Sequence, residues 1–208
     1  MKWLVLDAFG VIYSAGDDVV EWLIPFLRER GCTASTATVN ALYTECSLGS
    51  FTTDVFWRKL GFSEPNDHLN QHYLRRHTLT TGLIPFLKSM KAKNVPIACL
   101  SNDVAEWSHI LRRLHGLDAY ISQWTISGEA RARKPSPEIY TRLLGSLDAS
   151  AHECLFVDDR PKNLDAAAAL EFQTALFAPS GQQAADVNHR VLFSLWELDQ
   201  YLAQADRL

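Results

Sequence analysis

The sequence predicts an α/β fold: a Rossmann-like, doubly wound parallel sheet with an inserted helical segment. Apolar runs typical of strands alternate with helical patterns along most of the chain, and one long interval holds helical patterns only. Strands of a parallel sheet are buried on both faces, so near-continuous apolar runs are typical of them. Five such runs meet polar or turn residues: "WLVLD", "PIACLSND", "AYISQWTIS", "ECLFVDD" and "FQTALFA".

Helical patterns separate these runs, as a doubly wound sheet requires. Each has apolar residues three and four positions apart, the spacing of one helix face. The predicted helices cover 83–94, 104–117, 136–147 and 161–171. The third has local support, because Ser136 is a favoured N-cap residue and Pro137 suits the first helical position.

The interval 14–82 contains no convincing strand. Its patterns predict helices over 19–31, 35–49, 52–62 and 66–77. We therefore expect a core of residues 1–13 and 83–208, interrupted by a helical cap of residues 14–82. The small and polar segments "YSAGDD" and "TLTTG" flank the cap and suit the two crossings of a hinge.

Composition narrows the classes of partner. The 208 residues are 47% hydrophobic, enough for a sizeable core, and carry 24 acidic against 20 basic residues for a net charge of -4. These charges are interspersed, so we expect a small-molecule partner and neither nucleic acid nor a membrane surface. No run approaches the roughly 20 apolar residues of a membrane span, and a charge comes too early for a signal peptide, so a cytoplasmic location is expected. The four cysteines lack C-x-x-C spacing and are expected to be reduced.

Polar residues at four predicted strand ends are the candidates for a site. In open α/β sheets, ligands bind beyond the carboxyl ends of the strands. Each residue also has a structural interpretation as a turn residue, helix cap or solvated charge, but coincidence at four strand ends favours a site. Together they could supply a carboxylate nucleophile, donors for an anion, a fixed cation and ligands for a hard divalent metal. The set is Asp7, Ser101, Asn102, Lys134, Asp158 and Asp159.

The sequence resembles hydrolases of the haloacid dehalogenase superfamily that have a helical cap, of the subgroup containing the phosphatase domain of epoxide hydrolases. Four motifs carry this resemblance over nearly the whole chain: "LVLDAFGV", "ACLSND", "ARKPSPEIY" and "LFVDDRPKNLDAA". It implies that Asp7 is the nucleophile and that Ser101 holds the transferring group. Lys134 would neutralise charge, and Asp158 would bind Mg²⁺.

The resemblance also implies the remaining contacts. Asp159 would support the metal site from behind the direct ligands or bind the metal through water. The backbone carbonyl of Phe9 would be a metal ligand with Asp7 and Asp158. Phe9, Gly10, Asn102 and Tyr140 are the expected substrate contacts, although core packing is an equally good interpretation of Tyr140.

Phe9 departs from the family pattern. The phosphatases carry a second aspartate here, D-x-D, which protonates the leaving group and activates water; phenylalanine can do neither, at a typical cost of about a hundredfold to ten thousandfold in rate. We therefore expect Mg²⁺-dependent phosphoryl transfer on small molecules whose leaving groups need little protonation.

Two alternatives stay open. The "DAFGV" motif resembles the D-A-Y-G-T pattern of 2-haloacid dehalogenases, which attack carbon without a metal, although the adjacent Asp158 and Asp159 favour a cation. The loss of one proton-transfer group would also suit a catalytically degenerate binding module. The substrate and the oligomeric state are not predicted.

Overall fold

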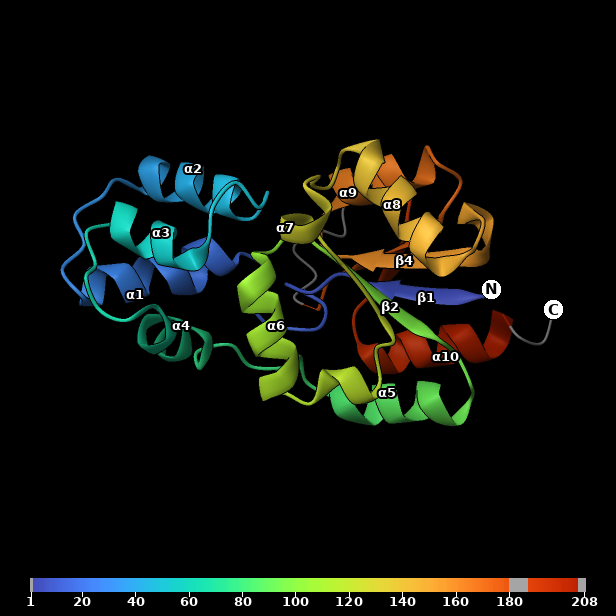
Figure 1. Cartoon of the computed structure of the whole chain (residues 1–208). Helices are drawn as coiled ribbons and strands as arrows, with labels where there is room; N and C mark the ends of the chain where they lie inside the picture. The colour runs from blue at the N-terminus through green and yellow to red at the C-terminus, as the bar shows by residue number, and fades with distance from the viewer. Residues whose placement is uncertain (1, 180–186, 206–208) are drawn as a thin grey trace.

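The computed structural model describes residues 2–179 and 187–205, and six parallel strands form a single sheet with helices on both faces (Figure 1). The strand order is β3-β2-β1-β4-β5-β6. This confirms the predicted α/β fold class. The strands are β1 (Trp3–Leu6), β2 (Ile97–Ser101), β3 (Gln123–Ile126), β4 (Cys154–Asp158), β5 (Gln173–Phe177) and β6 (Arg190–Leu192).

The five predicted strands are present, and the structure adds two elements at the C-terminal end. These are β6 and the helix α10 (Leu195–Ala205). A strand of three residues that begins with an exposed arginine has too little apolar character to be recognised by its pattern. Its pairing with β5 therefore depends on tertiary contacts.

Helices fill the connections, mostly where the patterns predict them. The π-helical turn η1 (Val19–Leu23) continues into α1, and α7 is a short helix that follows β3 directly. The helices are α1 (Ile24–Glu29), α2 (Thr36–Cys46), α3 (Thr53–Lys59), α4 (Asn66–Leu74), α5 (Leu83–Ala92), α6 (Ala105–Leu114), α7 (Ser127–Ala130), α8 (Pro137–Leu147) and α9 (Pro161–Ala168).

Alternation along β1 divides the core into two layers. Leu4 and Leu6 belong to one apolar cluster with residues of α5 and α10, whereas Val5 belongs to another with residues of α8 and α9. All three side chains are fully buried. The helices accordingly lie on opposite faces of the sheet in Figure 1. Burial on both faces explains why the strands are continuous apolar runs.

The sheet reverses its winding between β1 and β4, which pair in parallel although they are far apart in the chain. Leu6 lies opposite Val157, and the Asp7 amide donates to the Val157 carbonyl at 2.9 Å. Asp7 and Asp158 consequently follow adjacent strands at the switch point, where open α/β sheets bind ligands.

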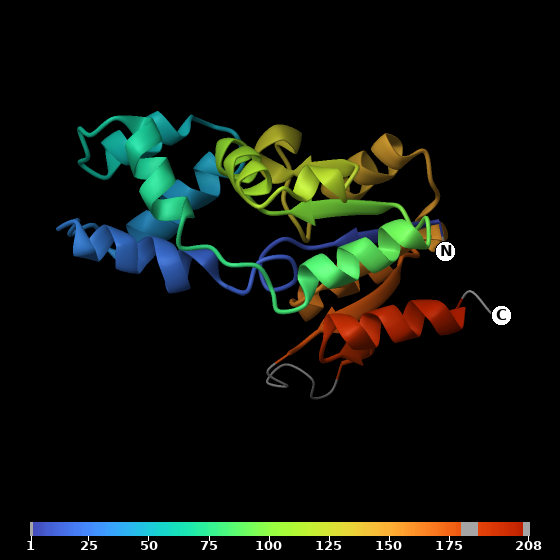
Figure 2. The same cartoon turned by 90° about the horizontal axis from the view of Figure 1, so that it is seen from below.

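Helices α1 to α4 form a helical module beside the sheet, away from both termini of the chain (Figures 1 and 2). Its core is aromatic: the rings of Phe26, Trp57 and Tyr73 contact one another with centroids 5.7–6.1 Å apart. Asn70 joins the module to α6, because its Oδ1 accepts from the indoles of Trp57 at 2.8 Å and Trp107 at 2.7 Å. The module lies within the interval predicted as the cap, whose limits at 14 and 82 stay a prediction.

Two smaller expectations bear on the class of protein. Cys32, Cys46, Cys99 and Cys154 are all buried free thiols, as predicted. Among the described residues, no helix has the length and apolar character needed to cross a membrane.

Candidate active site

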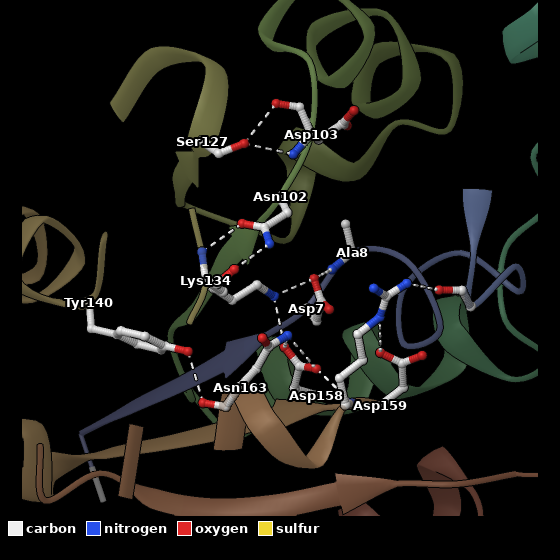
Figure 3. A network of polar contacts seen from close by, with 12 residues as sticks. Asp7, Ala8, Asn102, Asp103, Ser127, Lys134, Tyr140, Asp158, Asp159 and Asn163 are labelled. Carbon is white, nitrogen blue, oxygen red and sulfur yellow. Dashed lines mark hydrogen bonds and ion pairs between the residues drawn. The ribbon is translucent and has the colours of Figure 1, made fainter. Parts of the chain in front are cut away.

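A buried lysine joins the two acids at the switch point. The Lys134 Nζ lies 2.7 Å from Asp7 Oδ1 and 2.7 Å from Asp158 Oδ2 (Figure 3). Burial opposes the charge on the amine, but the carboxylates of Asp158 and Asp7 outweigh it and raise the pKa of Lys134. Lys134 is therefore a fixed cation between the two strand ends.

Asn102 holds the loop that presents this lysine. Its Oδ1 accepts from the Lys134 amide at 2.8 Å, and its Nδ2 donates to the Lys134 carbonyl at 2.9 Å. Both groups of the side chain amide thus bind one residue of the neighbouring loop. Asn102 was expected to contact substrate; the structure shows it positioning Lys134 and also lining the cavity described below.

Asp158 is held by the beginning of α9. Asn163 Nδ2 lies 3.1 and 3.0 Å from its two carboxylate oxygens, and the Arg160 amide donates to Oδ1 at 2.8 Å. Tyr140, expected at the substrate, instead donates its hydroxyl to the Asn163 carbonyl at 2.8 Å and is fully buried. Sequence reasoning did not assign Asn163 to the site, although its place five residues after Asp158, in the first turn of a helix, was a usable signal.

Three carboxylates converge at this point. Asp7, Asp158 and Asp159 each offer an oxygen within 4.8 Å of the others. Gly10 permits the approach of Asp159: its φ is +82°, and a Cβ there would lie 2.5 Å from the Asp159 carboxyl. Gly10 was expected to contact substrate, and the structure gives it this packing role beside a second cavity.

The acids repel one another. Burial and the charge of Asp158 raise the pKa of Asp7 well above its ordinary range, and the same two causes raise the pKa of Asp159 to about 7. Lys134 contacts two of the acids and Arg160 Nε lies 3.9 Å from Asp159 Oδ1, so three ionised carboxylates would still outnumber these two cations. The arrangement favours a bound cation.

Among the described residues, several buried oxygen atoms lack hydrogen-bond partners, and two of these belong to predicted site residues: Ser101 Oγ at the end of β2 and Asp159 Oδ1. Ser101 itself is fully buried. Buried polar atoms are nearly always satisfied, so each such atom calls for a ligand, ion or water. Both lie on residues that the sequence placed in the site.

Phe9 follows the nucleophile candidate with its side chain 8% exposed. Its ring packs on Tyr13 at 5.5 Å and on His77 at 5.8 Å between centroids, and it contributes to the cavity wall. The backbone bonds that close this loop run from Gly10 to the Tyr13 carbonyl and from Tyr13 to the Ala8 carbonyl. Neither engages the Phe9 carbonyl, the group that was expected to face a metal.

A cavity of about 270 Å³ opens above these residues, between the strand ends and α2 of the helical module. Sequence reasoning missed its second set of cations: Arg133, Arg160 and Lys162 line it with Lys134. The run "RARK" was visible, but a sequence does not show which way each side chain turns. The described lining comprises Asp7, Phe9, Gly16, Asp17, Asp18, Val19, Asn40, Tyr43, Thr44, Asn102, Arg133, Lys134, Arg160, Lys162 and Asn163.

A second buried ionic cluster lies where the chain enters and leaves the helical module. Asp18 accepts from the Tyr73 hydroxyl, 2.6 Å from each oxygen, and contacts His77 Nε2 at 2.5 Å. The other ring nitrogen, His77 Nδ1, faces the Leu74 carbonyl at 3.2 Å. Both nitrogens face acceptors, an arrangement that favours the doubly protonated ring. We call Asp18, Tyr73 and His77 the hinge cluster; residues so distant in sequence gave no signal of pairing.

Comparison with known families decides the class of this site. A model of the haloacid dehalogenase-like hydrolases matches residues 1–171, most of the chain. The chain belongs to this hydrolase family. The family assignment agrees with the resemblance carried by the four strand-end motifs.

Two curated relatives of this family member are phosphatases or hydrolases by name. This chain is 30% identical, over 107 residues or 51% of its own length, to flavin mononucleotide hydrolase 1 of Arabidopsis thaliana, a chloroplast protein. It is 33% identical over 84 residues, 40% of its length, to a sesquiterpene phosphatase of Aspergillus oryzae. The matched segments span 43% of each relative.

Solved structures share the fold of this family member at low identity. A phosphatase of the family from Thermococcus onnurineus has a TM-score of 0.73 at 16% identity, with 97% of this chain and 98% of that one covered. The L-2-haloacid dehalogenase of Xanthobacter autotrophicus has a TM-score of 0.69 at 18% identity, with 98% of each chain covered. A Bacteroides thetaiotaomicron family enzyme, solved with magnesium and inorganic phosphate, has a TM-score of 0.72 at 18% identity, covering 88% of this chain and 98% of that one.

Proposed function

We propose that this hydrolase is a Mg²⁺-dependent phosphatase that acts on small phosphorylated molecules, with Asp7 as the nucleophile. The observation that carries the proposal is the convergence of the Asp7, Asp158 and Asp159 carboxylates within 4.8 Å of one another, with Lys134 bonded to the first two. An attack on carbon needs one carboxylate. Three of them at one point are suited to a hard divalent ion.

The residues present fit such an ion. Asp7 and Asp158 would each give a carboxylate oxygen, the Phe9 carbonyl is not engaged by the bonds that close its loop, and Asp159 has a buried oxygen with no hydrogen-bond partner among the described residues. Mg²⁺ prefers such oxygen donors, completed by water and phosphate oxygens. When bound, the ion would supply positive charge that offsets the repulsion between Asp7 and an anionic substrate.

The chain's own groups account for the rest of the chemistry. A carboxylate oxygen of Asp7 forms a bond to phosphorus as the bond to the leaving group breaks, and the leaving group departs with the electron pair. Water then attacks phosphorus as the bond to Asp7 breaks: the Asp7 carboxylate departs with the electron pair, and both protons of the water leave with the released phosphate. Lys134 Nζ holds positive charge beside Asp7, and the Ser101 hydroxyl is the free donor for a phosphoryl oxygen.

Phe9 restricts which leaving groups depart. Its ring lies in the cavity wall where the family's phosphatases carry a carboxyl group, and it moves no proton. Acyl phosphates, activated esters and phosphoramidates that already carry a protonated nitrogen have leaving groups that need little protonation by the enzyme, so they are the preferred substrates. The names of the curated relatives and the magnesium and phosphate bound to one structural neighbour support phosphoryl chemistry.

One observation favours a second candidate, carbon-halogen hydrolysis: an aromatic side chain rather than a carboxyl follows Asp7 in the cavity. A halide leaves without a proton, so Phe9 suits that reaction equally well. Asp159 distinguishes the two, because its carboxyl group has no use in a reaction without a metal. Chloride release from 2-chloropropionate in a chelator would establish the dehalogenase.

The test is hydrolysis of 4-nitrophenyl phosphate, acetyl phosphate and flavin mononucleotide by the purified protein. We expect turnover of the first two with Mg²⁺, loss of turnover in excess EDTA, and a fall of at least about ten thousandfold in Asp7→Asn. Asp165→Asn, an exposed substitution on α9, is the control. Turnover unchanged by EDTA or by Asp7→Asn would overturn the proposal, and inactivity in every assay would favour a binding module.

A further inference from the structure

Arg133 and Lys134 are neighbours in sequence whose side chains serve different parts of the cavity. Lys134 contacts the acids at the strand ends. Arg133 instead extends to the helical module, where its Nη1 bonds the Ser47 hydroxyl and its guanidinium lies 5.9 Å from the centre of the Tyr43 ring. The cavity thus has one cation at the reacting end and another at the module end.

The other cations of the cavity are occupied or exposed. Arg160 donates to the Gly16 carbonyl at 2.8 Å and has Asp17 and Asp159 within 4.0 Å, while Lys162 is exposed. Arg133 is partly buried, yet among residues 2–179 and 187–205 it forms no ion pair. A guanidinium has five N–H donors, and one hydroxyl partner leaves most of them free toward the cavity.

A guanidinium removed from water without an acidic partner is costly, and burial accordingly lowers the pKa of Arg133. A ligand anion would satisfy it. A carboxylate matches its paired N–H groups in two parallel bonds, and it is small enough for a cavity of about 270 Å³ that also receives a phosphoryl group. That volume is below the roughly 300–1,000 Å³ of sites for drug-sized ligands.

The rest of the wall at the module end is mainly polar. Asn40 and Thr44 of α2 line it beside the apolar Val19. Its two acids already have partners, because Asp17 lies 3.7 Å from Arg160 and Asp18 lies 2.5 Å from His77. Such a wall suits a short polar spacer and does not suit a long apolar chain, because the polar groups would be left without partners.

We propose that Arg133 forms a subsite for a second anionic group, so that the substrate is a small phosphorylated carboxylic acid with its phosphoryl group at Asp7 and its carboxylate at Arg133. This rests on the proposed phosphatase function and deepens it. Arg133 is then a specificity-determining residue, and Lys134 serves the chemistry.

The kinetic test compares 4-nitrophenyl phosphate bearing a 3-carboxylate with the same ester bearing a 3-carboxamide. The two have the same shape, and the carboxylate alone adds a charge. In wild-type protein we expect kcat/KM for the carboxylate to exceed that for the carboxamide about tenfold to hundredfold, mainly through KM. In Arg133→Gln the ratio falls to within about twofold of one.

Two control variants separate the subsite from a structural role. Ser47→Ala removes the module contact of Arg133 but keeps the guanidinium, so the ratio should persist. Arg131→Gln removes an exposed arginine two residues away and should behave as wild type. Circular dichroism verifies that each variant folds. A kcat/KM ratio near one in wild type overturns the proposal, and so does a wild-type ratio that is retained in Arg133→Gln. The proposal also fails if Ser47→Ala lowers the ratio as much as Arg133→Gln does.

A binding arm makes the subsite testable without turnover. Calorimetry with Mg²⁺ compares 3-phosphonopropionate with its carboxamide in wild type and in Arg133→Gln. The subsite is supported if the carboxylate binds more tightly than the carboxamide in wild type but not in Arg133→Gln. This holds even if no phosphate ester is hydrolysed, a result that would contradict only the proposed function. Equal binding of the two compounds in wild type overturns the subsite even if hydrolysis is observed.

Discussion

The active-site network and the hinge cluster are both buried groups of ionisable residues, but they differ in how completely their charges and hydrogen bonds are matched. In the hinge cluster, Asp18 accepts from Tyr73 and His77, and both nitrogens of His77 face acceptors. In the active site, one lysine directly contacts two of three clustered acids, and Ser101 Oγ has no partner among the described residues.

The difference indicates what each network is for. A buried ion pair with satisfied hydrogen bonds keeps its geometry without any ligand, and breaking it leaves an uncompensated charge. An incomplete network has unmatched charge and unsatisfied donors that a bound ligand can match. We therefore expect the hinge cluster to stabilise the position of the helical module, and the active site to bind an ion and an anionic substrate.

The largest expected effect separates the two networks by stability. His77→Gln should lower the free energy of unfolding by about 3 kcal/mol at pH 6, because it leaves Asp18 buried without its cation. Asp7→Asn should lower it by less than about 1 kcal/mol without Mg²⁺, because it removes one of three repelling acids. Urea unfolding measures both. A larger loss in Asp7→Asn than in His77→Gln would contradict the comparison.

The effect of pH sharpens this prediction. Burial opposes the charge on His77, but its hydrogen bond to Asp18 and the charge of Asp18 outweigh it and raise the pKa above 6.5. The stabilisation by the charged ring is then fully present below pH 6.5 and lost as pH rises through the folded-state pKa. The gap between wild type and His77→Gln should therefore narrow in alkaline solution.

A smaller effect tests the apolar residue that lies between the two networks. Phe9→Asp should raise turnover of an alkyl phosphate such as ethyl phosphate by about a hundredfold relative to Phe9→Asn, because aspartate alone can protonate the leaving alkoxide. Both variants lose the packing of the Phe9 ring on Tyr13 and His77, so the asparagine variant corrects for that loss. Equal rates in the two folded variants would reject this explanation.

Gly10→Ala should weaken the active-site network from the backbone. A side chain at φ +82° costs about 1–2 kcal/mol, and the added methyl group would collide with the Asp159 carboxyl. We expect a loss of stability of that size together with a higher Mg²⁺ requirement for activity. Gly61→Ala has a similar φ of +88° and nothing within 4 Å, so it controls for strain alone. The same Mg²⁺ requirement in both variants would argue against the packing role.

The smallest expected effect concerns Asp103, a buried carboxyl outside both networks. Burial and then the charge of Asp18 raise its pKa to about 8. The folded protein retains that proton where the unfolded chain has lost it, so this group's contribution to stability falls as pH rises from about 4 to 8. Asp103→Asn removes this titration, so its stability relative to wild type should be higher at pH 8.5 than at pH 5. A gap that does not change with pH would contradict this.

The sequence predicts the active-site network better than the hinge cluster for a physical reason. Asp7 directly follows β1, Asp158 ends β4, and Lys134 lies in the connection that leaves β3. The carboxyl ends of the strands in a parallel sheet lie at one edge, so the topology brings these residues together. Asp18 is the N-cap of η1 and His77 follows α4, 59 residues later, and no periodicity pairs them. The orientation of the Arg133 side chain could not be predicted for the same reason, because the side chains of adjacent loop residues contact different parts of the structure.

The central claim is that the acids of β1 and β4 together hold a divalent ion beside the attacking oxygen of Asp7. The most direct measurement is anomalous scattering from crystals soaked with Mn²⁺ and a fluoride mimic of the phosphoryl group. We predict one strong peak in contact with the carboxylates of both Asp7 and Asp158. Crystals with the mimic bound but no peak there, or with the ion elsewhere, would contradict the account.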